Sequence, residues 1–250
     1  MEDQTRPQLL DGGHVNDSTR RVARAWALHS FTGFGVVVGL FALTATFSGH
    51  AAAAVGWMLV AVIMDGLDGP LARSWGVAEA LPEIDGCTLD TVVDYFNCVV
   101  VPVAFVWHFA MLPAALDIPV LAIVMFTSSL WYSRTDMMTA DHWFNGFPAE
   151  WQLVVPTMYI VSGSQAATVG VLVALAVSQL TTIKFVHPVR VAEGRILNLA
   201  LTLLWVGAIA VLVELAPHLP PWGPVVLLVG PAYQIAITVR RTLADAPVGS

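Results

Sequence analysis

The sequence predicts an all-helical protein that crosses a membrane about eight times. Of its 250 residues, 57% are hydrophobic and only 12% are charged, and the apolar residues fall into long runs. A soluble domain of this length cannot bury so much apolar surface, whereas lipid tails are as apolar as these side chains. The net charge of −7 discriminates little between classes of function, and we expect no nucleic-acid partner.

Residues 1–25 are predicted to form a cytoplasmic tail followed by an amphipathic helix at the membrane surface. They lack the apolar core of a secretory signal, and Asp17 or Ser18 suits the start of that helix. A single transmembrane domain over 26–241 and a C-terminal tail over 242–250 would follow. Eight apolar runs are expected to cross the bilayer: 26–47, 50–67, 88–110, 118–134, 151–163, 165–184, 196–215 and 223–240.

The basic residues predict the orientation of these spans. With eight spans and a cytoplasmic N-terminus, all 11 Lys and Arg residues fall on the cytoplasmic side. The opposite connectors, near 48–50, 109–117, 163–165 and 216–222, contain none. Because basic residues are retained on the cytoplasmic side of membrane proteins, both termini are expected there.

Four aspartates mark the cytoplasmic ends of two neighbouring spans: Asp65, Asp68, Asp90 and Asp94. The first two are three residues apart and the last two are four apart, so each pair shares one face of its helix. Carboxylates gathered near a membrane repel one another, and either protonation or bound cations would relieve this. Two divalent cations, which prefer oxygen ligands, would balance the four charges.

Small residues beside these aspartates leave the helix faces open. Gly69 and Ala72 lie one turn after Asp65 and Asp68, and Gly86 lies one turn before Asp90. Arg73 adds a planar cation suited to phosphate oxygens. Carboxylates, open helix faces and an arginine together indicate a pyrophosphate site.

The same residues resemble the signature of the CDP-alcohol phosphotransferase family, D-x-x-D-G-x-x-A-R followed by G-x-x-x-D-x-x-x-D, at all eight positions. The spacer between Arg73 and Gly86 is longer than in most members. That length, with HSFTGFG at 29–35, FPAEWQLVV at 147–155 and FVHPVR at 185–190, resembles the bacterial branch that forms phosphatidylcholine. The resemblance implies a helical core of the family's type, with 26–241 as the catalytic domain.

The resemblance also implies a role for each matched residue. Asp65, Asp68 and Asp90 would bind two divalent cations, Mn²⁺ or Mg²⁺, with Asp90 bridging them. Asp94 would face the second ion and act as general base. The CDP-diacylglycerol substrate would be bound by the remaining residues: Gly69, Ala72 and Gly86 for the nucleotide, Arg73 for a phosphate and Thr32 for the cytidine.

The implied reaction transfers the phosphatidyl group of CDP-diacylglycerol to choline and releases CMP. It would take place at the cytoplasmic face of a bacterial inner membrane, among membrane lipids, and is compatible with a homodimer. Aromatic faces and carboxylates suit a quaternary ammonium, although interfacial aromatics are also membrane anchors and connector acids are often only solvated. The candidates are Tyr95, Trp131, Tyr132, Trp143, Phe144, Trp151, Glu79 and Glu83.

Two other functions are weighed. A related enzyme of the family would use serine or another alcohol, but an acceptor bearing a phosphate suits the acidic connector poorly. An ion-coupled transporter would hold carboxylates nearer the middle of the membrane. A second basic group lies at the ends of later spans and is equally suited to phosphate binding and to anchoring: Arg134, Lys184, His187 and Arg190.

Overall fold

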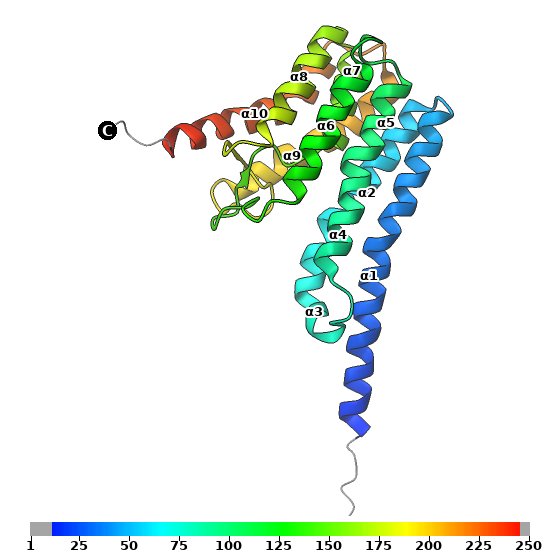
Figure 1. Ribbon diagram of the computed structural model, residues 1–250, viewed down its shortest axis with the longest axis vertical. Coiled ribbons are helices and arrows are strands. Elements are labelled where there is room, and N and C mark those ends of the chain that lie inside the picture. Colours follow the sequence, from blue (N-terminus) through cyan, green and yellow to red (C-terminus); the bar gives the residue numbers. More distant parts are fainter. Residues whose placement is uncertain (1–11, 246–250) are drawn as a thin grey trace, which may run out of the picture.

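The computed structural model describes residues 12–245, which form a bundle of helices with one small sheet (Figure 1). The helices are α1 (Gly12–Phe47), α2 (Ala51–Trp75), α3 (Val77–Ala80), α4 (Gly86–Asp94), the π-helix η1 (Tyr95–Val100), α5 (Val101–His108), α6 (Asp117–Tyr132), α7 (Trp151–Val161), α8 (Gln165–Ser178), α9 (Arg195–Leu215) and α10 (Gly223–Ala244). The strands are β1 (Phe144–Asn145) and β2 (Lys184–Phe185), which pair antiparallel.

All eight predicted apolar runs form helices, and the all-helical membrane fold class is confirmed. Within the described residues, five helical stretches are long and apolar enough to cross a membrane: 18–47, 51–75, 86–108, 195–215 and 223–244. The third comprises α4, η1 and α5 without a break. The other three apolar helices, α6, α7 and α8, have 16, 11 and 14 residues.

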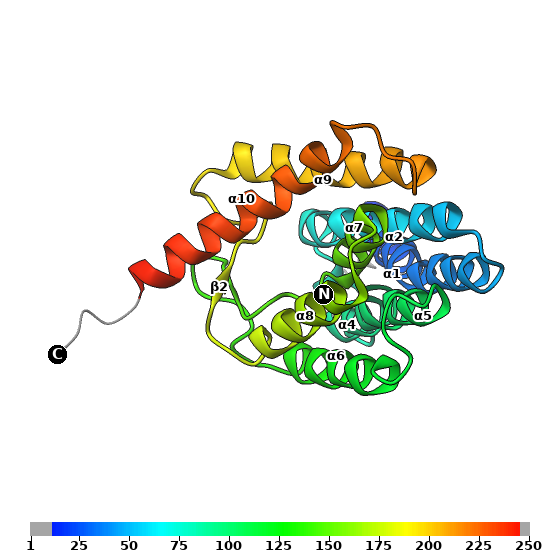
Figure 2. The same cartoon turned by 90° about the horizontal axis from the view of Figure 1, so that it is seen from above.

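Helix α7 is short but central. At 1.5 Å per residue it covers about half of a hydrocarbon core about 30 Å thick. It contacts α2, η1, α5, α9 and α10, and the view from above shows it between α9 and the helices that precede it in the chain (Figure 2). The first turn of α7 therefore lies deep within the bundle, where its side chains meet several other helices.

The sixth predicted apolar run, 165–184, extends beyond the end of the helix that it contains. Helix α8 stops at Ser178, and the next side chain, Gln179, is fully buried. Its amide accepts a hydrogen bond from Thr127 at 2.7 Å and donates one to Ser128 at 3.1 Å. The chain then turns into β2, so Lys184 lies in a strand rather than at the end of a span.

The predicted boundaries at the two ends also differ from the structure. Helix α1 begins at Gly12 and runs without a break through Arg20 and Trp26, so no separate helix starts at Asp17 or Ser18. Helix α10 continues to Ala244, past the predicted start of the C-terminal tail. Residues 1–11 and 246–250, which hold the rest of the two predicted tails, lie outside the described residues.

The connector between α2 and α4 is closed by two helix caps. Gly76 ends α2 in the left-handed conformation, with φ 59° and ψ 48°, which glycine adopts readily. Asp85 begins α4, because its Oδ1 accepts hydrogen bonds from the backbone N–H groups of Cys87 and Thr88. These caps turn the chain back on itself and bring the two halves of the aspartate pattern together.

Helix α1 approaches α4 and η1 closely because two of its glycines face them. A Cβ atom on Gly35 would lie 2.7 Å from the Val93 side chain, and one on Gly39 would lie 2.3 Å from Asn97 Oδ1. The Asn97 amide donates a hydrogen bond to the Gly35 carbonyl at 3.0 Å. Small residues four apart allow such contacts between membrane helices. The contact holds α4, which carries the second aspartate pair, and η1 against α1.

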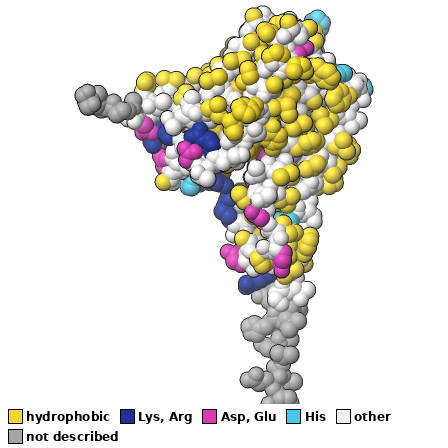
Figure 3. All heavy atoms as spheres, in the orientation of Figure 1, with side chains coloured by type: hydrophobic (Ala, Val, Ile, Leu, Met, Phe, Trp, Pro, Cys, Tyr) yellow, Lys and Arg dark blue, Asp and Glu magenta, His cyan; other side chains and the backbone are white. Residues whose placement is uncertain are grey.

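The charged side chains are unevenly distributed. Figure 3 shows Lys, Arg, Asp and Glu gathered mostly at the lower end of the face drawn, below a broad hydrophobic surface. Large apolar side chains are exposed along the helices, for example Phe126, Ile196 and Leu203 at 62%, 86% and 61%. Such exposure is unfavourable in water and suits contact with lipid.

Gly39→Ala should destabilise the fold relative to Gly56→Ala. Both glycines are helical, but a Cβ at Gly56 meets no atom within 4 Å. The shared gain in helix propensity cancels in the comparison, and overpacking at Gly39 should leave a difference of about 1–3 kcal/mol. Thermal unfolding in detergent measures it. Equal melting temperatures would mean that the close contact of α1 with η1 is not tight.

Candidate active site

Three of the four aspartates converge. Asp65 and Asp68 project from α2 and Asp90 from α4, and one carboxylate oxygen of each lies within 4.8 Å of the others. Two opposite oxygen ligands of one Mg²⁺ are about 4.2 Å apart. Because the donors are hard oxygens at nearly that spacing, these residues fit a divalent cation. Arg190 also attracts Asp65 and Asp90 electrostatically.

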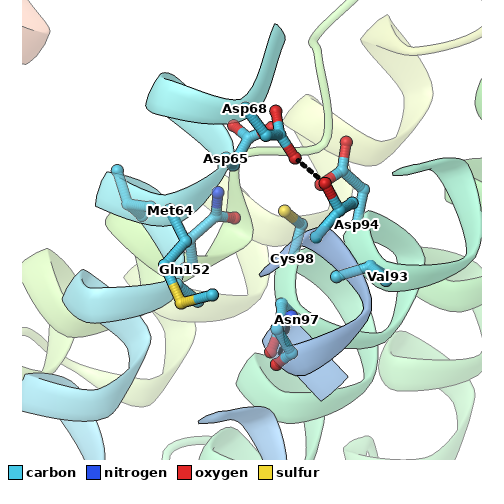
Figure 4. Close-up of a pocket in the computed structure, with 12 residues that line it drawn as sticks. Met64, Asp65, Asp68, Val93, Asp94, Asn97, Cys98 and Gln152 are labelled. Carbon is cyan, nitrogen blue, oxygen red and sulfur yellow. Dashed lines mark hydrogen bonds between the residues drawn. The ribbon is translucent and has the colours of Figure 1, made fainter. Parts of the chain in front are cut away.

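Asp94 lies on the other side of a small cavity from Asp65 and Asp68. The cavity has a volume of about 20 Å³, close to the space of one water molecule. Figure 4 shows the three carboxylates above it, with Gln152 and Cys98 projecting from other helices. Thr32, which lines the same cavity, donates a hydrogen bond to Asp68 Oδ2 at 3.0 Å. The hydroxyl of Thr32, which the sequence predicts to contact the cytidine, therefore lies beside Asp68, a predicted metal ligand.

Two arginines lie beside Gly69. A Cβ atom built on this glycine would be 3.3 Å from one Arg73 nitrogen and 3.9 Å from one Arg190 nitrogen. Arg190 comes from the loop after β2, far from the aspartates in sequence. Of the four residues in the second basic group, Arg134 instead pairs with Asp136 and Lys184 with Asn145. The open helix face at Gly69 thus lies between the aspartates and two guanidinium groups. Phosphate oxygens placed there would accept hydrogen bonds from these groups.

The other predicted small residues pack against protein. A Cβ atom on Gly86 would lie 3.0 Å from the His29 ring, so this side of α4 faces α1. Ala72 packs with the cluster around Ala25 and Val77. His29 is buried, and its Nε2 has no hydrogen-bond partner in the described residues. His29 lies within HSFTGFG, and no role was predicted for it from the sequence.

Helix α7 brings two further polar residues to the site. Gln152 is 5% exposed, lines the aspartate cavity, and its Oε1 has no hydrogen-bond partner between residues 12 and 245. Glu150 precedes the helix, and its charge acts on Asp65. Burial raises the pKa of the Glu150 carboxyl to about 7, with no offsetting donor or cation in the described part of the chain. Both residues lie in FPAEWQLVV, where an acid directly before an apolar run was an available signal.

The aromatic residues predicted to bind an ammonium fall into two groups, one buried and one less buried. Trp131, Trp143 and Trp151 are 3%, 3% and 0% exposed. The Trp131 indole donates to the Asn145 carbonyl and that of Trp151 to Ser128, at 2.8 and 2.9 Å. Arg241 lies over the Trp143 ring. The three tryptophans therefore contribute to packing.

The remaining candidates are less buried. Tyr95 and Tyr132 meet edge to face at 6.0 Å, and Tyr95 donates to the Met125 carbonyl. Phe144 stacks on His187 at 5.1 Å. Glu79 and Glu83 are exposed on the connector between α2 and α4. The eight candidates thus lie in separate places, and their part in ammonium binding stays a prediction.

Comparison with known proteins agrees with this geometry. The sequence profile of the CDP-alcohol phosphatidyltransferase family matches residues 25–214. The chain belongs to that family. Two phosphatidylcholine synthases show the similarity. The one from Pseudomonas aeruginosa is 32% identical over 223 residues, 89% of this chain and 94% of the relative, and the one from Legionella pneumophila is 35% identical over 179 residues, 70% of each chain.

Membership in the family makes the chain a transferase of phospholipid metabolism. It also excludes the ion-coupled transporter considered from the sequence. The match begins at residue 25 and spans helices α1 to α9, so it includes Arg190, Glu150 and Gln152 as well as the aspartates.

Asn substitution of Asp65, Asp68 or Asp90 should each weaken Mn²⁺ binding by more than about tenfold, because each removes one charged ligand. Asp245→Asn is the matched control, since Asp245 pairs with Arg241 at the end of α10. Electron paramagnetic resonance of the purified protein measures free Mn²⁺ directly. Unchanged affinity in all three variants would show that the cluster does not hold the metal.

Proposed function

We propose that this chain synthesises phosphatidylcholine by transferring the phosphatidyl group of CDP-diacylglycerol to choline. The observation that carries the proposal is the three-carboxylate cluster beside Gly69, with Arg73 and Arg190 on the open face of the helix. The names of the relatives from P. aeruginosa and L. pneumophila support the choice of reaction.

The reaction breaks a phosphoanhydride bond and forms a phosphoester bond. The choline hydroxyl oxygen attacks the lipid-side phosphorus, the bond from that phosphorus to CMP breaks, and CMP leaves. Asp94, across the small cavity from Asp65 and Asp68, takes the hydroxyl proton. Arg73 and Arg190 hold the phosphate oxygens over Gly69 and orient the phosphorus for in-line attack.

Two divalent cations, Mn²⁺ or Mg²⁺, complete the proposed site. Asp65, Asp68 and Asp90 would hold them, with Asp94 facing the second ion and Thr32 orienting Asp68. Bound there, the ions supply electrostatic stabilisation of the pyrophosphate charge. The nucleotide would lie along α2 at Gly69 and Ala72 and approach α4 at Gly86.

We further propose the bacterial inner membrane as the location, with both termini and the site on the cytoplasmic side. The basic residues support this orientation, because the connectors at the other end lack them. Acyl chains then remain in the bilayer while the pyrophosphate reaches the aspartates at its edge. Dimerisation of two copies is part of the same proposal and rests on the family resemblance.

The identity of the acceptor is tested by a parallel assay. Purified protein with CDP-diacylglycerol and Mn²⁺ should form lipid from labelled choline, and much less from serine or glycerol 3-phosphate, because the connector acids repel the carboxylate of serine and the phosphate of glycerol 3-phosphate. Thin-layer chromatography of the labelled lipid identifies each product. A chelator should abolish turnover and added Mn²⁺ should restore it. If serine is the better acceptor, the proposed product is wrong, although the family and the metal cluster stand.

Asp94→Asn should lower kcat by about 10²–10⁴-fold, because the amide keeps the shape of the side chain but takes no proton. CDP-diacylglycerol should still bind, since Arg73, Arg190 and Gly69 are unchanged. Single-turnover kinetics measures the chemical step, and equilibrium binding of the nucleotide lipid is the control. A kcat near that of the unmodified chain would remove Asp94 from the role of base.

A further inference from the structure

A second cavity is lined by α7 and by Glu150, which directly precedes that helix. Its volume is about 390 Å³, and α8, α9, α10, the end of β2 and the segment between β1 and α7 form the rest of its wall. Its wall is almost entirely apolar and includes the rings of Phe147, Phe185 and Trp205. Glu150 is its one acidic residue among the described residues that line it.

The Glu150 carboxylate has no partner in this wall. It is half-buried and lines the cavity, and burial raises the pKa of the carboxyl. A carboxylate in an apolar wall without a donor or cation is unfavourable, since its hydration is lost without compensation. A cationic ligand placed in the cavity would supply the missing charge.

The other polar groups that face the cavity are already engaged. The Thr157 hydroxyl donates to the Leu153 carbonyl at 2.8 Å and accepts from the Trp205 indole at 2.9 Å. The Gln234 amide donates to Thr202 at 3.5 Å. A primary ammonium would bring three N–H donors to a wall with few free acceptors. A quaternary ammonium has none, and it gains from ring faces instead.

The first turn of α7 links this cavity to the reaction site. Glu150 directly precedes α7 and lines the large cavity, while Gln152, in the first turn, lines the small cavity with Asp65 and Asp94. The Gln152 Oε1 has no partner in residues 12–245 and is free to accept a hydrogen bond from a hydroxyl. Glu150 is close enough to Asp65 for their charges to interact, and choline carries its hydroxyl only two carbons from its nitrogen.

We propose that Glu150 is the counter-ion of the acceptor's quaternary ammonium, and that the adjoining apolar cavity makes the enzyme specific for a trimethylated amine. This rests on the proposed function and names residues outside the aromatic candidates that the sequence suggested. Glu150 selects and positions the acceptor, and Gln152 orients its hydroxyl towards Asp94.

The test compares choline with its neutral isostere, 3,3-dimethylbutan-1-ol, using the purified full chain in phospholipid nanodiscs. The unmodified chain should prefer choline in kcat/KM by more than about tenfold, the factor that corresponds to about 1.4 kcal/mol. Glu150→Gln should raise KM for choline by about 10–100-fold and bring the preference close to one. The KM for CDP-diacylglycerol should stay within about twofold of its original value.

Two further variants separate charge from folding. Glu150→Asp keeps the charge and should retain most of the preference for choline. Glu214→Gln removes an exposed carboxylate from the far end of α9 and should behave as the unmodified chain. The comparison of the two alcohols in the unmodified chain needs no substitution, so equal kcat/KM values there overturn the inference even if Glu150→Gln does not fold.

The remaining outcomes are distinct. An unchanged choline KM in folded Glu150→Gln overturns the inference and leaves the proposed function intact. A raised KM for CDP-diacylglycerol alone also overturns it, because the cavity then holds an acyl chain. If the unmodified chain transfers to another alcohol but not to choline, both the proposed function and this inference fall.

Discussion

The repulsion among carboxylates at one end of the bundle is the constraint around which the rest of the structure is arranged. Asp65, Asp68 and Asp90 lie within 4.8 Å of one another, next to a membrane whose interior cannot solvate charge. Helices alone would not hold such a group together. The caps at Gly76 and Asp85, the glycine contacts of α1 with η1 and the nearby guanidinium groups together hold the aspartates in place.

The arrangement also explains why the site is built from distant parts of the chain. The aspartates come from α2 and α4, Thr32 from α1, Gln152 from α7 and Arg190 from the loop after β2. Each of these elements packs against its neighbours through apolar surface. The free energy of this packing offsets the electrostatic repulsion between the carboxylates that the fold holds near one another. The short α7 contributes to this arrangement, because its first turn brings Gln152 to the cavity that Asp65 and Asp94 line.

Much of the fold and of the aspartate site could be predicted from the sequence, because hydropathy and residue spacing are local patterns. A hydrophobic span is recognised from the length of its apolar run, so all eight apolar runs that form helices were found, and the i, i+3 and i, i+4 spacing revealed the aspartate pairs. Where a helix ends depends on long-range contacts, which is why the burial of Gln179 against Ser128 could not be foreseen. Arg190 and Glu150 were not assigned to the site for the same reason: only folding brings them to Gly69 and Asp65.

The tryptophans illustrate a different limit. An aromatic residue near the end of a span has the same sequence pattern whether it anchors the protein in the membrane, supports a loop or encloses a ligand. The indole N–H groups of Trp131 and Trp151 donate hydrogen bonds to a carbonyl of β1 and to a serine of α6. Their partners lie 14 and 23 residues away, beyond any local periodicity.

The π-helix η1 begins directly after Asp94 and has its own consequence. Its wide turn accommodates one more residue than an α-helical turn, and one residue corresponds to about 100° of rotation. A helical wheel drawn through Gly86–His108 therefore assigns the faces of α5 wrongly when it is aligned on the aspartates. A change of length within η1 would therefore rotate α5 against α1, α6 and α7 while α4 kept its place.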